Sequence, residues 1–238
     1  MSLPKPQITF DKQLQTRNIQ ISLGLWRIRH FQILKSEYDF TSISQKISNS
    51  IRNTYSLESI KNDSLISQYR AFYWHKLHLD PTKIRPAAEA LIRRILSQKD
   101  IPIIIPLVDA YNWASIASRI PMGAYDQSAV VLPLQLRFTV LQESFIPIGK
   151  TAISLDPDTL VLSDSNATIL CQYPYRDSQR TMVGVYSQEI VVIAYGVPGI
   201  TVNQLQEALD YTREHLNWLQ SHQIIQYSAD EYHFFSNE

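Results

Sequence analysis

Residues 189–212 read EIVVIAYGVPGITVNQLQEALDYT, a stretch that predicts a strand followed directly by a helix. The run 189–195 is apolar and rich in β-branched residues, which is typical of a buried strand. After a turn that contains Pro198 and Gly199, Thr201 is suited to cap a helix that runs to about residue 220. Four leucines give this helix an apolar side: Leu205, Leu209, Leu216 and Leu219.

Upstream of this stretch, short β-rich runs are separated by proline, aspartate and glycine turns. They predict strands at 128–132, 134–141, 159–163, 167–172 and 182–186. The chain from 17 to 34 alternates apolar and polar residues, which indicates one strand or a bent pair of strands.

Helices are predicted between these two groups of strands. They cover 41–55, about 59–76, 86–96 and 108–119, and residues 101–105 predict a short buried segment. Helices first, then strands, then a closing helix indicate an α+β fold. The sequence has no internal repeat and no linker rich in glycine or serine, so a single domain over 1–238 is expected.

Composition excludes several classes of protein. Hydrophobic residues make up 45% of the chain and charged residues 18%, which argues against extensive disorder. No stretch approaches the roughly 20 apolar residues that span a bilayer, and the chain shows no secretion signal. With one cysteine, Cys171, no internal disulfide can form. We therefore expect a soluble, cytoplasmic protein.

The net charge is zero, but the charges are unevenly distributed. Residues 1–100 hold 16 Lys and Arg against 8 Asp and Glu, whereas residues 101–238 hold 6 against 14. This asymmetry has two interpretations, which the sequence leaves open. The halves complement each other within one fold, or the first half presents a basic surface to a polyanion such as RNA.

Isolated reactive residues give little indication of chemistry. Cys171 lies within an apolar run and is predicted to be buried and inert. His75 and His78 have a spacing that can serve a metal, but no further ligand cluster accompanies them, so we expect surface residues, no metal and no cofactor. Asp156, Asp158 and Asp164 lie in predicted turns, where aspartate bonds the backbone.

The segment 173–181 is more informative, because charged, hydroxyl and aromatic side chains converge between two apolar strands. It favours a pocket. The alternative is an exposed hairpin in which Arg176 and Asp177 pair only with water or with each other.

A dense run of ordered motifs lies between Asp80 and Asp126. It reads DPTKIRP at 80–86, EALIRR at 89–94, LVDAYN at 107–112 and PMGAYD at 121–126. Within it, Glu89 and Arg93 lie one helical turn apart in the favourable order for an ion pair.

The last two motifs resemble the B3/B4 module of the bacterial phenylalanyl-tRNA synthetase beta subunit, whose pattern is roughly VVDVTNY followed by QPLHAFD. The residues that match with the same internal spacing are Asp109, Asn112, Pro121, Ala124 and Asp126. The first two motifs resemble the freestanding members of that family, which carry the module without a synthetase.

This resemblance implies a layered sandwich of mixed β-sheet with flanking helices. It also implies three parts of one domain: an N-terminal strand and helix extension at 1–80, a core module at 81–200, and a closing helix and tail at 201–238. In the synthetase the module binds the charged tRNA end and hydrolyses wrongly attached amino acids, above all tyrosine.

Carried over to this chain, the resemblance implies a pocket with Asn112, Gly123 and Asp126 on one side and Asp177 and Ser178 on the other. Gly123 stands where the family motif has histidine, and 171–176 replaces a glycine-rich stretch. An aminoacyl ester is already activated, so orienting a water molecule and holding the tRNA end can suffice for hydrolysis.

The site residues are assigned on that basis. Asp126 or Asp177 orients the water, and Asn112 or Thr181 binds the polar groups of the amino acid. Arg176 or Arg180 contacts phosphate. The residues expected to bind RNA are Lys83, Arg85, Arg93, Arg94 and Arg180. For Asp109, Asn112 and Asp126, an alternative role in bonding the backbone carries equal weight.

Three functions remain open from the sequence. The first is a freestanding tRNA-binding protein that deacylates mischarged tRNA in trans. The second is a non-catalytic module that recognises RNA or a free amino acid. The third is an enzyme that acts on a small amino-acid-like metabolite, with Arg176 as an anion anchor. None of them involves DNA or a membrane, and the sequence does not determine the oligomeric state.

Overall fold

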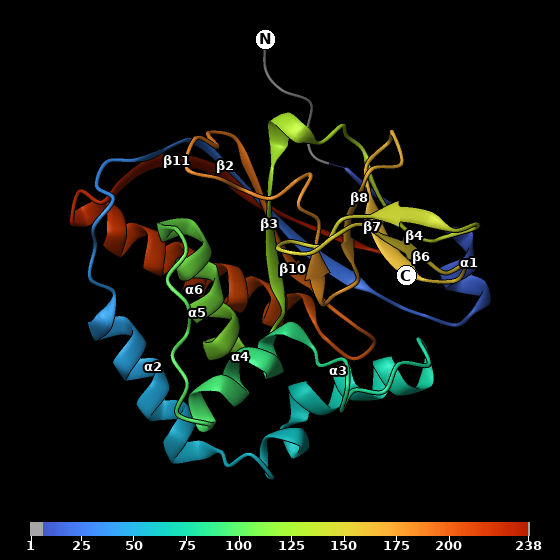
Figure 1. The fold of residues 1–238 in the computed structure, drawn as a ribbon, viewed down its shortest axis with the longest axis horizontal. Helices are drawn as coiled ribbons and strands as arrows, with labels where there is room; N and C mark the ends of the chain where they lie inside the picture. Colours follow the sequence, from blue (N-terminus) through green and yellow to red (C-terminus); the bar gives the residue numbers. More distant parts are fainter. Residues whose placement is uncertain (1–6, 238) are drawn as a thin grey trace.

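The computed structural model of the protein describes residues 7–237. A four-stranded antiparallel sheet lies at its centre, with strand order β11-β2-β10-β3. Its strands are β2 (Ser22–Ile33), β3 (Met122–Asp126), β10 (Ile190–Tyr195) and β11 (Ile225–Ser236). Figure 1 shows helices gathered beside this sheet and the remaining strands beyond it.

A second, five-stranded sheet has the order β1-β4-β7-β8-β9. Its strands are β1 (Ile8–Phe10), β4 (Leu134–Phe138), β7 (Leu160–Ser163), β8 (Ile169–Gln172) and β9 (Arg176–Asp177). The β1–β4 pair is parallel and the other pairs are antiparallel, so the sheet is mixed. A separate hairpin joins β5 (Glu143–Phe145) to β6 (Ile153–Leu155).

Six α-helices accompany the sheets in the described part of the chain. They are α1 (Lys12–Thr16), α2 (Thr41–Thr54), α3 (Ser64–His75), α4 (Ala87–Leu96), α5 (Pro106–Ser118) and α6 (Val202–Ser221). Two short 3₁₀ turns are η1 (Ile60–Asn62) and η2 (Gln127–Ala129). The α+β fold with mixed sheet and flanking helices is the predicted one.

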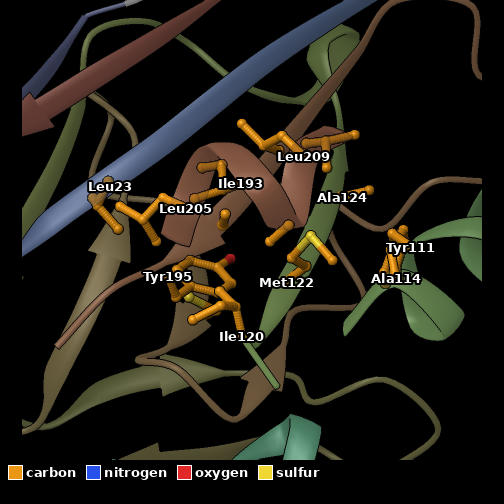
Figure 2. Packing of buried hydrophobic residues seen from close by; sticks show 14 of the residues in the cluster. Leu23, Tyr111, Ala114, Ile120, Met122, Ala124, Ile193, Tyr195, Leu205 and Leu209 are labelled. Carbon is orange, nitrogen blue, oxygen red and sulfur yellow. The ribbon is translucent and has the colours of Figure 1, made fainter. Parts of the chain in front are cut away.

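One face of the central sheet packs against α6. Thr201 caps this helix in a reciprocal capping box with Gln204, which fixes where it begins. Gly24 of β2 allows close approach, because a Cβ there would lie 3.2 Å from Leu209. Figure 2 shows Met122 and Ala124 of β3 in the same buried core.

The opposite face of the central sheet meets the five-stranded sheet. The ring of Tyr173, just after β8, packs edge-on against that of Tyr195 at the end of β10, with centroids 5.3 Å apart. Side chains on a strand alternate between faces, so Met122 and Ala124 point toward α6 while Gly123 and Tyr125 point toward the second sheet. The strands β3 and β10 therefore carry side chains into both layers.

Most predicted elements are confirmed within a few residues at their ends, and three are wrong. Residues 128–132 form the end of η2 and a loop, because Asp126 bonds Ser128 and bends the chain. Residues 182–186 form an exposed loop. The 101–105 segment was expected to be buried, but Ile103 is 77% exposed. In addition, residues 225–236 form the strand β11, whereas the sequence predicts a tail there.

The ion pair predicted within α4 is confirmed. Arg93 Nε donates to Glu89 Oε1 at 2.7 Å, and Arg70 of α3 donates to both Glu89 oxygens at 3.0 and 3.1 Å. Glu89 is fully buried, so it joins the two helices within the core.

Among the helices of residues 7–237, none combines the length and the apolar character that a membrane span requires.

Candidate functional site

A polar cluster lies between the two sheets, formed by Gly123, Tyr125, Asp177 and Tyr195, and we call it the Asp177 cluster. The Tyr125 hydroxyl donates to Asp177 Oδ1 at 2.7 Å. The Tyr125 and Tyr195 hydroxyls are also hydrogen-bonded to each other. Because the one proton of Tyr125 goes to the carboxylate, Tyr195 is the donor in the second bond.

Strand pairing brings these residues together. Asp177 lies on β9 opposite Cys171 of β8, and the backbone of β8 and β9 directs it toward the central sheet. Tyr125 follows Gly123 at the two-residue period of a strand, so both face Asp177. The amide of Tyr195 donates to the Pro121 carbonyl at 2.9 Å, which fixes the end of β10 beside the start of β3.

Gly123 leaves the space that the polar groups occupy. A Cβ at this position would lie 2.9 Å from Tyr195 Oη, 3.1 Å from Asp177 Oδ1 and 3.1 Å from Tyr125 Oη. Such distances are closer than ordinary van der Waals contact, so any larger residue would have to displace at least one of these groups. The position that holds histidine in the resembled motif is therefore filled here by groups from three strands.

Burial changes the acidity of the Asp177 cluster. Burial raises the pKa of Asp177 to about 6, and the hydrogen bond from Tyr125 opposes this change. Burial also raises the pKa of Cys171 to about 12, and the nearby charge of Asp177 adds to the effect. The pKa of Tyr111 on α5 is raised by burial and then by the charge of Asp177. The phenols and the thiol are thus neutral at pH 7, while Asp177 titrates close to neutrality.

This arrangement suits acid–base chemistry. With a pKa of about 6, Asp177 is about 90% ionised at pH 7 and still basic enough to accept a proton. Its Oδ2 accepts no hydrogen bond from another described residue, whereas Oδ1 is held by Tyr125. The free oxygen can accept a hydrogen bond from water, a hydroxyl group or an ammonium group.

Asp126 lies apart from the Asp177 cluster. It is one position out of step with Gly123 and Tyr125 on β3, so it faces the other way. Its Oδ1 accepts bonds from the Ser128 amide and hydroxyl at 2.9 and 2.6 Å, and its Oδ2 accepts one from Ser187. Burial acts to raise its pKa, but these hydrogen bonds outweigh burial and lower it. The structure thus gives Asp126 a role in capping η2.

Asp109, which the resemblance also matched, bonds its own surroundings. It is buried, it accepts a hydrogen bond from the Tyr38 hydroxyl, and its Oδ1 accepts the Ile104 amide at 3.0 Å. These bonds hold the 101–105 loop over the start of α5.

The predicted substrate-binding residues occupy different environments. Asn112 is half-buried on α5, next to Tyr111. Ser178 is buried, and its hydroxyl accepts the Arg180 amide at 3.1 Å in the turn after β9. Thr181 is fully buried, and its hydroxyl makes no hydrogen bond within the described residues.

Some of the predicted RNA-binding residues already form hydrogen bonds or ion pairs within the fold, and others are exposed without an ion pair among the described residues. Arg93 is held by Glu89 and by the Leu57 carbonyl, and Arg94 donates twice to the Asp100 carbonyl. Lys83, Arg85 and Arg180 are exposed and form no ion pair with any described residue.

Arg176 lies with its guanidinium 5.6 Å from the centre of the Tyr175 ring. It is half-buried and forms no ion pair with another described residue. Arg176 and Asp177 therefore do not pair with each other, which leaves contact with water as the remaining part of the hairpin alternative.

Part of the excess positive charge of residues 1–100 is neutralised by ion pairs with acidic residues of the second half. Arg17 pairs with Asp158, and both Arg27 and Arg29 contact Asp230. Basic residues of the first hundred thus pair with acidic residues of the remainder.

Sequence reasoning missed the phenols that complete the Asp177 cluster. Tyr125 could have been found from its two-residue spacing to Gly123. Tyr195 could not, because its contact depends on the pairing of β10 with β3. Cys171 is buried as predicted, and it lies within the electrostatic reach of Asp177.

His75 and His78 are exposed, as predicted. No group of three or more His, Cys, Asp or Glu residues within 7–237 could hold a metal ion.

Comparison with known proteins identifies the family. The profile of the B3/4 domain matches residues 68–218, which is more than half of the chain. No curated protein matches this chain.

One solved structure with a similar arrangement is an N-terminal fragment of the phenylalanyl-tRNA synthetase beta-subunit from Pyrococcus horikoshii, with a TM-score of 0.44 and 13% sequence identity. The match covers 91% of this chain and 50% of that one, so the chain corresponds to half of that fragment. The profile match shows that this chain belongs to the B3/4 domain family.

Proposed function

We propose that this protein is a freestanding tRNA-binding protein of the synthetase editing-module type that hydrolyses mischarged aminoacyl-tRNA in trans. The observation that carries the proposal is the Asp177 cluster, in which a carboxylate with a pKa near neutrality keeps one oxygen free. Membership of the B3/4 domain family supports a tRNA-related role.

In the proposed reaction, Asp177 Oδ2 accepts a hydrogen bond from the attacking water. The water oxygen forms a bond to the ester carbonyl carbon, and its proton passes to Asp177. The bond between that carbon and the terminal ribose oxygen then breaks, and the leaving oxygen takes the proton back from Asp177, which regenerates the carboxylate. The products are a free amino acid and uncharged tRNA. Tyr125 keeps the carboxylate in place through its bond to Oδ1.

Binding is assigned to residues at and around the cluster. Thr181, with its unpartnered hydroxyl, and Asn112 are proposed to bind polar groups of the amino acid. Gly123 and Ser178 are proposed to border the amino-acid site. Asp126 has no part in the proposed step, because both of its oxygens are already bonded.

Phosphate contacts are proposed for the available basic residues Lys83, Arg85, Arg176 and Arg180. Arg93 and Arg94 contribute less, because their guanidinium groups already donate to partners within the fold. A cytoplasmic location belongs to the same proposal.

A second candidate function is recognition without hydrolysis. It is favoured by the crowding at Gly123, where Tyr125, Asp177 and Tyr195 fill the space that the family's histidine would need. In this case the protein binds tRNA or a free amino acid and leaves the ester intact.

The test is a deacylation assay with a panel of aminoacyl-tRNAs, using the wild type, Asp177→Asn and the exposed control Asp156→Asn. The proposal predicts accelerated hydrolysis of at least one species, which is lost in Asp177→Asn and retained in Asp156→Asn. Binding of tRNA without any turnover by the wild type would support the second candidate and contradict the first.

A further inference from the structure

A cavity of ≈450 Å³ lies among α2, α5 and α6, on the side of the molecule where Figure 1 shows these helices together. This volume falls within the range of small-molecule sites. None of the described residues of the Asp177 cluster lines it. The cavity is therefore separate from the proposed editing site.

Its walls are apolar on two sides. Ile43, Ile47 and Ile51 repeat at four-residue spacing along α2, so one face of that helix borders the cavity. Trp218 of α6 lines it as well, and its ring is held edge-on by Phe40 at 5.6 Å. These side chains can bury an apolar body of moderate size.

His215 of α6 supplies a fixed hydrogen-bond acceptor. It lines the cavity, is only 7% exposed, and bonds the Ala110 carbonyl through Nδ1 at 2.9 Å. A carbonyl can only accept, so Nδ1 carries the proton and Nε2 presents a lone pair. Burial lowers the pKa of His215, which keeps the ring neutral. No described residue donates to Nε2.

Arg119 supplies donors at the same cavity. It ends α5 in the left-handed conformation, with φ of 62°. Its buried Nε forms an ion pair with Asp63 Oδ1 at 3.6 Å but donates no hydrogen bond to a described residue. Its Nη1 has only a long bond of 3.4 Å to Tyr55. This guanidinium is incompletely satisfied and suits an added carboxylate.

Glu214 adds a negative charge at the mouth, where it is exposed and forms no ion pair with another described residue. The cavity thus combines an apolar wall with the guanidinium of Arg119, the exposed ammonium group of Lys46, the carboxylate of Glu214 and a neutral imidazole acceptor. A ligand that carries an apolar group, a carboxylate and an ammonium group matches this set.

We propose that this cavity binds a free α-amino acid with an apolar side chain. Its carboxylate contacts Arg119, its ammonium group donates to His215 Nε2 and Glu214, and its side chain lies between Ile47 and Trp218. The proposal does not depend on the proposed hydrolysis.

The experiment is isothermal titration calorimetry of the full chain with L-phenylalanine, L-leucine and L-methionine. Two analogues of phenylalanine that lack one charged group, 3-phenylpropionate and phenethylamine, serve as probes of the zwitterion. The proposal predicts saturable binding of at least one amino acid and at least about tenfold weaker binding of both analogues, or about 1.4 kcal/mol.

Variants locate the site. Ile47→Trp fills the cavity and Glu214→Gln removes the exposed charge, and each is expected to weaken binding about tenfold. Glu58→Gln, an exposed carboxylate away from the cavity, and Asp177→Asn are expected to leave binding unchanged. Thermal unfolding confirms that each variant is folded.

Two results would overturn the proposal. One is the absence of heat with all three amino acids. The other is binding that survives both Ile47→Trp and Glu214→Gln but is lost in Asp177→Asn, which would assign the amino acid to the Asp177 cluster.

Discussion

At the scale of single residues, the absence of a side chain at Gly123 determines the geometry of the Asp177 cluster. The glycine has no side chain to contribute, and its absence allows two phenols and a carboxylate to meet. In this arrangement Asp177 Oδ1 accepts a hydrogen bond from Tyr125, and Oδ2 accepts none from another described residue. The chemistry attributed to this site therefore rests on Asp177, Tyr125 and Tyr195 together.

Gly123→Ala is expected to destabilise the protein by about 1–3 kcal/mol, because the new Cβ would lie 2.9 Å from Tyr195 Oη. Tyr195→Phe removes that oxygen, so the same change in a Tyr195→Phe background should cost less. Urea unfolding of the four proteins measures this coupling.

The matched control is Gly184→Ala, where a Cβ would meet no atom within 4 Å. An equal loss of stability at positions 123 and 184 would contradict the crowded geometry of the cluster.

The ionisation of Asp177 predicts how stability varies with pH. Its folded pKa of about 6 exceeds the value of about 3.9 in an unfolded chain. The folded state therefore binds more protons between these values, and stability falls as the pH rises from about 4 to about 6. Asp177→Asn removes this loss while keeping an oxygen that can accept the Tyr125 hydroxyl.

Thermal unfolding across pH 4 to 8 tests this prediction. The variant should gain in Tm relative to the wild type at pH 7.5, and the gain should shrink toward pH 4. A Tm difference that does not change with pH would contradict a raised pKa at Asp177.

At this scale two of the four members of the Asp177 cluster, Gly123 and Asp177, followed from the sequence, and Tyr125 and Tyr195 did not. Gly123 and Asp177 were assigned to one pocket, and they meet. Asp126 was assigned to the same pocket, but strand alternation turns it toward Ser128 and Ser187. A motif gives the order of residues along the chain. The face of the sheet toward which each side chain points depends also on which residues form the strand, and the sequence did not predict the strand β3.

At the scale of elements, α4 is tied to α3 by a buried carboxylate. Glu89 accepts hydrogen bonds from Arg70 and Arg93 and has no exposed surface. The pairing with Arg93 followed from helical spacing, but the contact with Arg70 crosses between helices and has no local signal.

Glu89→Ala is expected to lower the free energy of unfolding by about 3 kcal/mol or more, because two guanidinium groups lose their common partner. Arg94→Ala should cost less than about 1 kcal/mol, since Arg94 is exposed and bonds one carbonyl. Urea unfolding gives both values. A loss at Glu89 no larger than that at Arg94 would contradict the role of this ion-pair group.

Elements were predictable where a local signal was strong. Thr201 and Gln204 determine the start of α6, and leucine spacing determines its face. β11 and β3 gave no such signal, because they are stabilised by pairing with distant strands. The loop at 182–186 has the composition of a strand, but among the described residues it is bridged to β3 only through its first residue, Met182.

At the scale of the whole molecule, some basic residues of the first hundred form ion pairs within the fold and others remain exposed on the surface. Arg17, Arg27 and Arg29 contact acidic residues of the second half. Lys83 and Arg85 remain exposed in the family's matched region. They are two of the four basic residues that we propose to contact the phosphate groups of tRNA.

The double variant Lys83→Glu and Arg85→Glu is expected to weaken tRNA binding at least about tenfold at low salt and to reduce the slope of affinity against salt. The control, Lys12→Glu with Lys150→Glu, makes the same change in net charge at exposed residues elsewhere. Filter binding over a range of salt concentrations measures both. Equal weakening by the two double variants would indicate that only net charge matters.

Single-turnover deacylation tests the proposed role of Asp177 in hydrolysis. Each aminoacyl-tRNA is mixed with excess wild-type protein or with Asp177→Asn, and loss of the ester is followed with time. The wild type is expected to accelerate hydrolysis of at least one mischarged species, whereas Asp177→Asn is expected to bind the same tRNA but to lose at least about a hundredfold in rate. Equal rates for the wild type and Asp177→Asn on every species would contradict it.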